Sequence, residues 1–231
     1  HYRLLRAPWG PGNSYPEFVA LFGSAADDGP FNHVYGAVRS CLRALGLDAA
    51  RFDTPEWNPL GALVRRGGRI VLKPNFIRHW NPLEQGTVES VITHGAVVRA
   101  VADYAFLAAG AEGSVAIAES PQQDCDFERI REIAGLDAIV RHYEETLSRE
   151  LEVIDLRRET VVFRDGIIVE RRPLPGDPAG YRAVDLGARS FFSGSGLDPA
   201  RYRGADYDPS VTTEHHQGGR NAYLLSETGL S

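Results

Sequence analysis

Four polar side chains stand directly after two short apolar runs of the sequence. Lys73 and Asn75 follow one run, and Glu119 and Ser120 follow the other. If the runs are neighbouring strands of a parallel sheet, an ammonium, an amide and a carboxylate converge where open α/β sheets bind ligands. Lys73 then binds an anion or donates a proton, and Glu119 acts as a general base or metal ligand. The alternative is a structural salt bridge, since a charge beside a buried strand needs a partner.

A second candidate lies one loop further on, where Thr93 and His94 precede a strongly amphipathic segment. Backbone N–H groups at the start of a helix, together with the Thr93 hydroxyl, can hold a phosphate or carboxylate. His94 is the third candidate catalytic residue, as a ligand or an acid. In the alternative interpretation, Thr93 only caps the helix and His94 is a surface residue.

The loop between these two places contains Arg78, His79 and Trp80. With Asn81 the loop combines cationic, aromatic and amide groups, which are typical of a loop that contacts a substrate. We assign Arg78 and His79 to substrate binding with Asn75, Thr93 and Ser120. A solvated loop with one packed Trp explains the same residues equally well.

Divalent-metal donors occur near the end of the chain. His215 and His216 follow Glu214, with Asp206 and Asp208 upstream. Adjacent residues of an extended chain point in opposite directions, so they share one ion with difficulty. A divalent metal held by His215 and His216 is therefore the weakest of the site predictions.

The periodicity of apolar residues predicts an α/β fold. Short apolar runs alternate with segments whose apolar residues recur at helical spacing. Strands are predicted over 17–23, 69–73, 114–118 and 152–156, and helices over 32–45, 58–65, 94–110, 127–134 and 136–149. This order favours a mostly parallel, Rossmann-like sheet with helices on both faces.

The pattern changes after residue 158. Residues 160–163 and 167–170 flank Asp165-Gly166 and predict a β-hairpin, whereas 193–219 show little periodicity. We therefore expect an α/β domain over 1–158 and a β-hairpin with a loop-rich extension over 159–231. The extension is expected to belong to the same domain and to be cut short at its C-terminal end.

Composition excludes several functional classes. With 43% hydrophobic and 24% charged residues, the 231-residue chain is globular, and a net charge of -6 disfavours nucleic-acid binding. Arg99 and Asp103 interrupt the longest apolar stretch, so neither a membrane span nor a signal peptide is expected. Cys41 and Cys125 stand alone, which disfavours a disulfide framework or an iron–sulfur cluster and favours the cytoplasm. The chain begins at His1 and contains no Met, so we expect a fragment.

Several of these segments occur in a familiar order. Val71-Leu72-Lys73-Pro74-Asn75, Ile92-Thr93-His94 and Ile117-Ala118-Glu119-Ser120-Pro121 resemble the strand ends and helix start of the family catalogued as domain of unknown function 362. Residues 174–178, 202–208 and 215–224 resemble a branch found among surface-polysaccharide biosynthesis genes. The resemblance covers most of 17–231.

The chain departs from the pattern of this family in three respects. Glu119 replaces the usual Asp, a later lysine-rich element lies beyond Ser231, and the cysteine ligands of the iron–sulfur members are absent. The resemblance therefore implies no cluster within this chain.

Together these features predict an enzyme, or the N-terminal part of one, that acts on an anionic small molecule in surface-polysaccharide or cofactor metabolism. Lys73 and Asn75 would hold the ligand, and Glu119 or His94 would transfer a proton or bind a metal. Two alternatives stay open. One is a non-catalytic module that binds a ligand or a partner, and the other is an electron-transfer protein whose iron–sulfur module lies outside this chain.

Overall fold

A computed structural model describes residues 5–23, 31–83, 85–196, 198, 201 and 213–230. Its centre is a three-stranded parallel sheet in the order β1-β2-β3. The strands are β1 (Arg69–Leu72), β2 (Ser114–Glu119) and β3 (Leu151–Asp155). The sheet confirms the parallel pairing of three of the four predicted strands, within two residues at each boundary.

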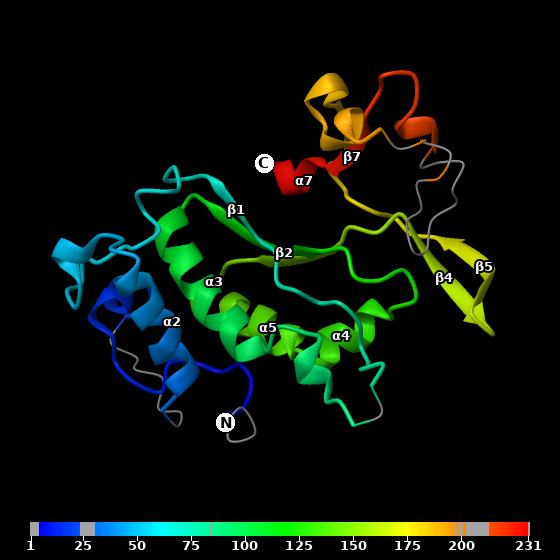
Figure 1. Cartoon of the computed structure of the whole chain (residues 1–231). Coiled ribbons are helices and arrows are strands. Elements are labelled where there is room, and N and C mark those ends of the chain that lie inside the picture. The colour runs from blue at the N-terminus through cyan, green and yellow to red at the C-terminus, as the bar shows by residue number, and fades with distance from the viewer. Residues whose placement is uncertain are drawn as a thin grey trace.

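Three helices connect these strands and lie on the same side of the sheet (Figure 1). They are α3 (Gly95–Ala109), between β1 and β2, and α4 (Phe127–Ile133) and α5 (Leu136–Leu147), between β2 and β3. Successive right-handed crossovers that advance across a sheet in one direction place all their helices on one face. The prediction of helices on both faces is therefore wrong for the described residues of the sheet.

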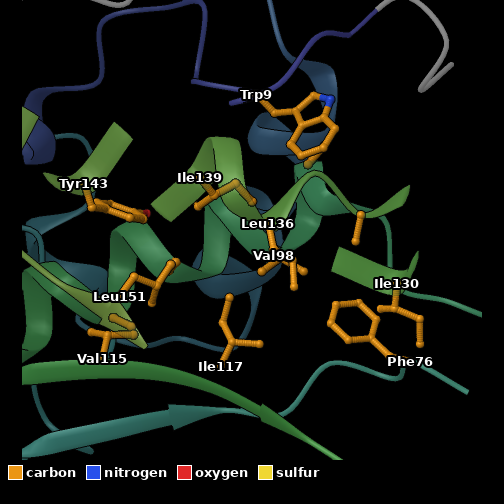
Figure 2. Packing of buried hydrophobic residues seen from close by; sticks show 14 of the residues in the cluster. Trp9, Phe76, Val98, Val115, Ile117, Ile130, Leu136, Ile139, Tyr143 and Leu151 are labelled. Atoms are coloured by element: carbon orange, nitrogen blue, oxygen red, sulfur yellow. The ribbon is translucent and has the colours of Figure 1, made fainter. Parts of the chain in front are cut away.

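The main core lies between the sheet and these helices. Alternate strand residues Val115, Ile117 and Leu151 point towards the helices, as Figure 2 shows. There they meet side chains of all three helices, and the loop after β1 adds Phe76. The helical residues labelled in this cluster are Val98, Ile130, Leu136, Ile139 and Tyr143. On the opposite face of the sheet, the described cluster contains only Ala116, Ala118, Ile154, Val71 and Leu156.

A second layer packs against the outer side of α3. It contains α2 (His33–Ala44), which confirms the predicted helix, and two short helical turns, η2 (Pro16–Phe18) and α1 (Val19–Phe22). The strand predicted over 17–23 is therefore wrong. Phe18, Leu21 and Phe22 recur at a spacing that suits a helix as well as a buried strand, and length does not separate the two for so short a run.

The segment 47–68 is irregular. It contains η3 (Ala49–Arg51) and consecutive turns, in which Gly61 N–H donates to the Asn58 carbonyl and Leu63 N–H to Leu60. The helix predicted over 58–65 is therefore wrong. Pro59 and Gly61 within eight residues favour turns over a continuous helix.

Two antiparallel pairs follow the parallel sheet. The predicted hairpin is present as β4 (Glu159–Arg164) and β5 (Ile167–Pro173), and it projects from the rest of the chain (Figure 1). β6 (Tyr181–Asp185) pairs with β7 (Ala222–Ser226), a pairing that periodicity did not predict. Short helical turns complete this part: η5 (Gly187–Arg189), η6 (Phe191–Gly194) and α7 (Glu227–Leu230), while η4 (Val88–Ser90) lies before α3. In the described part of the chain, no helix has the length and apolar character needed to cross a bilayer.

Candidate functional site

Lys73 and Glu119 meet at the carboxyl ends of adjacent strands. Leu72 of β1 lies opposite Ile117 of β2, so the next residues of the two strands are neighbours. The Lys73 Nζ atom lies 2.9 Å from Oε1 and 3.0 Å from Oε2 of Glu119. The predicted adjacency of these two residues is therefore confirmed, and they form an ion pair.

The Glu119 carboxylate has a donor on every side. Besides Lys73, Oε1 accepts the Ser120 N–H at 2.8 Å and Oε2 accepts the Phe76 N–H at 3.3 Å. Its side chain is only 4% exposed. The carboxylate therefore accepts three hydrogen bonds, all from groups of the protein. Glu119 joins the segments that follow β1 and β2, and its recorded contacts are with these segments.

Lys73 faces outward from this contact. Its side chain is 63% exposed, and an ammonium bound to one carboxylate keeps at least one N–H for solvent or a ligand. Asn75 and Ser120 are exposed beside it. Only their backbone groups make hydrogen bonds within the described residues. The open part of the site is thus one ammonium accompanied by two neutral polar side chains.

The third strand ends in a second ion pair. Asp155 lies opposite Glu119 in the register of β2 and β3, and its carboxylate accepts from Arg157 Nε at 3.0 Å and Nη2 at 2.7 Å. Arg157 Nη1 also donates to the carbonyls of Gln122 and Cys125. Arg157 therefore fixes the loop after β2 against the end of β3. Sequence reasoning missed this pair, although Asp155 closes its strand just as Glu119 does.

Thr93 and His94 serve the backbone rather than an open site. The Thr93 hydroxyl accepts the Asn75 N–H at 3.1 Å, which ties the loop after β1 to the start of α3. His94, not Thr93, caps α3, because its Nδ1 accepts the Ala96 N–H at 3.1 Å. Burial lowers the pKa of His94, and the charge of Glu89 opposes that shift. The neutral ring is the form that can accept the Ala96 N–H.

Protein atoms lie close against the first residue of α3. A Cβ added to Gly95 would lie 2.2 Å from Cζ3 of Trp9 and 2.1 Å from the Ala134 carbonyl oxygen. The Trp9 ring also meets His94 edge-on, with 5.2 Å between ring centroids. One side of the helix start is therefore covered by protein, and anion binding by Thr93 and the backbone N–H groups stays a prediction.

Arg78 and His79 contact the loop after β2. Arg78 Nε lies 3.7 Å from Oδ1 of Asp124, and its guanidinium lies 4.9 Å from the centre of the Trp80 ring. His79 Nδ1 accepts the Asp126 N–H at 3.0 Å, immediately before α4. These contacts hold the two loops together, and substrate binding by Arg78 and His79 stays a prediction.

The predicted metal donors at the end of the chain are described only in part. His216 Nδ1 lies 3.2 Å from Oδ1 of Asn221, and its ring packs 5.0 Å from that of Phe192. Among the described residues, no three His, Cys, Asp or Glu side chains come close enough to hold a metal ion. Asp206 and Asp208 lie outside the described residues. The geometry therefore gives His215 and His216 no third donor within the described part.

One further signal was present in the sequence and was missed. Lys73 is the only lysine of the chain, because 24 of the 25 basic residues counted as Lys or Arg are arginine. The two cations differ chemically, since lysine can lose its proton and arginine effectively cannot. The single amine side chain stands at the carboxyl edge of the sheet.

The fold is thus a mixed α/β structure with a three-stranded parallel sheet, helices and antiparallel hairpins. Comparison of the chain with family models, curated proteins and solved structures found no match. Any functional assignment accordingly depends on the geometry around Lys73.

Proposed function

We propose that the chain binds an anionic small molecule at the carboxyl ends of β1 and β2, as an enzyme or as part of one. The observation that carries this proposal is the pairing of an exposed ammonium with a buried carboxylate. The Lys73 side chain is 63% exposed, whereas that of Glu119 is 4% exposed. The buried carboxylate therefore holds the ammonium group in place, and the ammonium group faces the solvent. An anion gains a charge-assisted hydrogen bond there.

Two neutral side chains support this choice of ligand. Asn75 and Ser120 stand within two residues of Lys73 and Glu119 on the same edge, and both can donate to an oxyanion. Arg157, which follows the end of β3, is paired with Asp155 and buried. Lys73 is therefore the group expected to supply the attraction for the ligand.

The proposal includes a Rossmann-like fold and membership of the family catalogued as domain of unknown function 362. A Rossmann-like sheet would bind its ligand at this edge, and the resemblance to domain of unknown function 362 places its K-P-N strand end at Lys73 to Asn75. The resemblance further implies a role in surface-polysaccharide or cofactor metabolism, in the cytoplasm. The site chemistry agrees with an anionic substrate of either kind.

A non-catalytic binding module is the second candidate. It is favoured by the contacts of Glu119, whose three recorded hydrogen bonds all come from Lys73 and the backbone and give it a structural role. In that case the same edge holds the anion and carries out no reaction.

A thermal-shift screen tests the binding proposal. Inorganic phosphate, UDP-glucose and simple carboxylates are titrated into the wild type, Lys73→Ala and the control Arg172→Ala, which removes an exposed cation of the β5 strand. We expect an anion to raise the Tm of the wild type and the control but not of Lys73→Ala. Equal responses of all three proteins, or no response from any, would refute the proposal.

A further inference from the structure

The chain uses arginine for every other basic side chain counted as Lys or Arg, and lysine only at this edge. Arginine binds oxyanions at least as well as lysine, often with two parallel hydrogen bonds. A site that needed only a positive charge would be served by the residue the chain uses elsewhere. The property that arginine lacks is an amine that can be deprotonated and can attack a carbonyl carbon.

We propose that Lys73 forms an imine with the carbonyl group of an anionic oxo compound, such as a 2-oxo acid. This inference rests on the proposed function, because the same side chain attracts the anion. Beyond anion binding, the inference specifies that the ligand carries a carbonyl group and that it forms a covalent bond with Lys73. The side chain is 63% exposed, so a small carbonyl compound reaches Nζ from solvent.

Glu119 is placed to receive the proton that Lys73 must lose. Its two oxygens lie 2.9 Å and 3.0 Å from Nζ, so the proton moves along a hydrogen bond that already exists and needs no free lone pair. The N–H groups of Ser120 and Phe76 hold the carboxylate in this position. Glu119 therefore acts directly on the amine.

The Lys73 ammonium gives one proton to Glu119, and the free amine adds to the carbonyl carbon. One proton of the added nitrogen passes to the oxygen to give a carbinolamine. Glu119 returns its proton to the same oxygen through solvent water, and the oxygen leaves as one molecule of water. The product is a protonated imine, whose positive charge remains next to the carboxylate of the ligand. Asn75 and Ser120 are the neutral donors available to that carboxylate.

Reductive trapping tests the imine directly. The wild type is incubated with pyruvate and sodium cyanoborohydride, which supplies the hydride, and the product is analysed by intact mass and peptide mapping. We expect one carboxyethyl group on Lys73, formed on the order of tenfold faster than on the N-terminal amine, because a tenfold preference needs only about 1.4 kcal/mol of additional attraction. Equal labelling of the two amines, or none at Lys73, would overturn the inference.

Two comparisons separate this inference from the proposed function. Acetone, a neutral carbonyl compound, is expected to label Lys73 more slowly than pyruvate, and inorganic phosphate is expected to protect Lys73 from pyruvate. Lys73→Arg has no amine and should form no adduct at position 73, whereas the control Arg172→Ala should retain both the thermal response to phosphate and the adduct. A Lys73-dependent phosphate response without trapping leaves anion binding intact and refutes the imine, whereas the absence of both refutes the two proposals together.

Discussion

At the scale of single residues, Glu119 shows how one buried carboxylate can hold a site. Its side chain is almost completely removed from water, and Lys73, Ser120 and Phe76 all donate to it. A buried charge without such donors would be strongly destabilising. The exposed position of Lys73 thus depends on a residue that the ligand does not touch.

Replacing Glu119 by Gln tests this dependence. The amide keeps the shape but loses the charge, and it turns an NH2 group towards one of the backbone donors. We expect the free energy of unfolding to fall by about 2 kcal/mol in urea titration, because charge-assisted hydrogen bonds are lost at a buried position.

The matched control is Glu152→Gln, on the neighbouring strand β3. Glu152 pairs with Arg69 at 2.7 Å, but the two side chains are 39% and 35% exposed. An exposed ion pair contributes roughly 0–1 kcal/mol, so this substitution should change stability little. A larger loss in the control than in Glu119→Gln would contradict the structural role assigned to Glu119.

At the scale of elements, α3 decides how the layers fit together. Its Gly95 lies against the Trp9 ring and the Ala134 carbonyl, which closes the start of the helix. Only a residue without a side chain fits between them.

Gly95→Ala is therefore expected to destabilise the protein, although alanine favours helices. The added methyl would lie 2.1 Å from a backbone oxygen, so α3 or the end of α4 must move. We expect a loss of about 2 kcal/mol or more, measured by thermal and urea unfolding, in line with other overpacked cores.

Gly36→Ala in α2 is the matched control. There the added methyl meets the Tyr15 hydroxyl at 3.5 Å and Cζ of Phe31 at 3.9 Å, which are ordinary contacts. Alanine in a helix interior is roughly 0.5–1 kcal/mol better than glycine, so this variant should be stabilised. Similar behaviour of the two variants would show that the close approach at Gly95 does not control the packing.

The same helix carries a buried ion pair towards the outer layer. Arg99 and Asp103 lie one turn apart on α3, with Arg99 Nε 3.0 Å from Oδ1 of Asp103 and both side chains at most 1% exposed. Asp103 also accepts the hydroxyls of Tyr35 on α2 and Tyr143 on α5. Burial, together with the charge of Asp103, raises the pKa of both tyrosines, so they remain protonated donors.

Asp103→Asn leaves the Arg99 charge buried without its partner. Loss of one member of a buried pair typically destabilises by about 3 kcal/mol or more, and we expect a loss of that size in urea unfolding. Asp137→Asn is the control, because Asp137 pairs with Arg131 at a half-exposed position on α5. A small effect of Asp103→Asn would mean that the layers are joined by apolar contacts alone.

At the scale of the whole molecule, Asp177 joins the segment before β6 to the end of β7 and to α7. Its carboxylate accepts from the Ser226 hydroxyl at 2.5 Å, the Thr228 hydroxyl at 2.6 Å and the Thr228 N–H at 2.8 Å. Burial by itself would raise the pKa of Asp177, but these hydrogen bonds and that from Ala179 N–H outweigh it and lower the pKa to about 2.

This shift makes a pH-dependent prediction. A carboxyl group whose pKa is lower in the folded state stabilises the fold above its unfolded value of 3.8, and the contribution is lost as the pH falls towards about 2. The difference in pKa corresponds to roughly 2 kcal/mol. Asp177→Asn should therefore be less stable than the wild type in urea at pH 7, and the difference should shrink steadily between pH 4 and pH 2.

Asp53→Asn provides the control for this experiment. Asp53 pairs with Arg39, but its side chain is 66% exposed. Its replacement should alter stability little across the same range of pH. A constant difference between the wild type and Asp177→Asn from pH 7 to pH 2 would contradict the role assigned to the Asp177 carboxylate.

The sequence by itself determined the three parallel strands, the helices from α2 to α5 and the meeting of Lys73 with Glu119. Each depends on local signals: apolar runs of strand length, helical periodicity, and polar residues directly after a strand. These signals act over a few residues, so they are readable without knowledge of distant contacts.

Only the tertiary structure decided the rest. Residues 17–23 became helical, with Glu17 buried against Tyr104 and Arg39. Trp9, which is far away in the sequence, packs against Gly95 at the start of α3, and β6 pairs with β7 some forty residues later. The side of the sheet that the helices cover followed from the direction in which successive crossovers advance. In each case the outcome depends on packing between segments that are distant in the sequence. A local pattern of residues carries no information about such contacts.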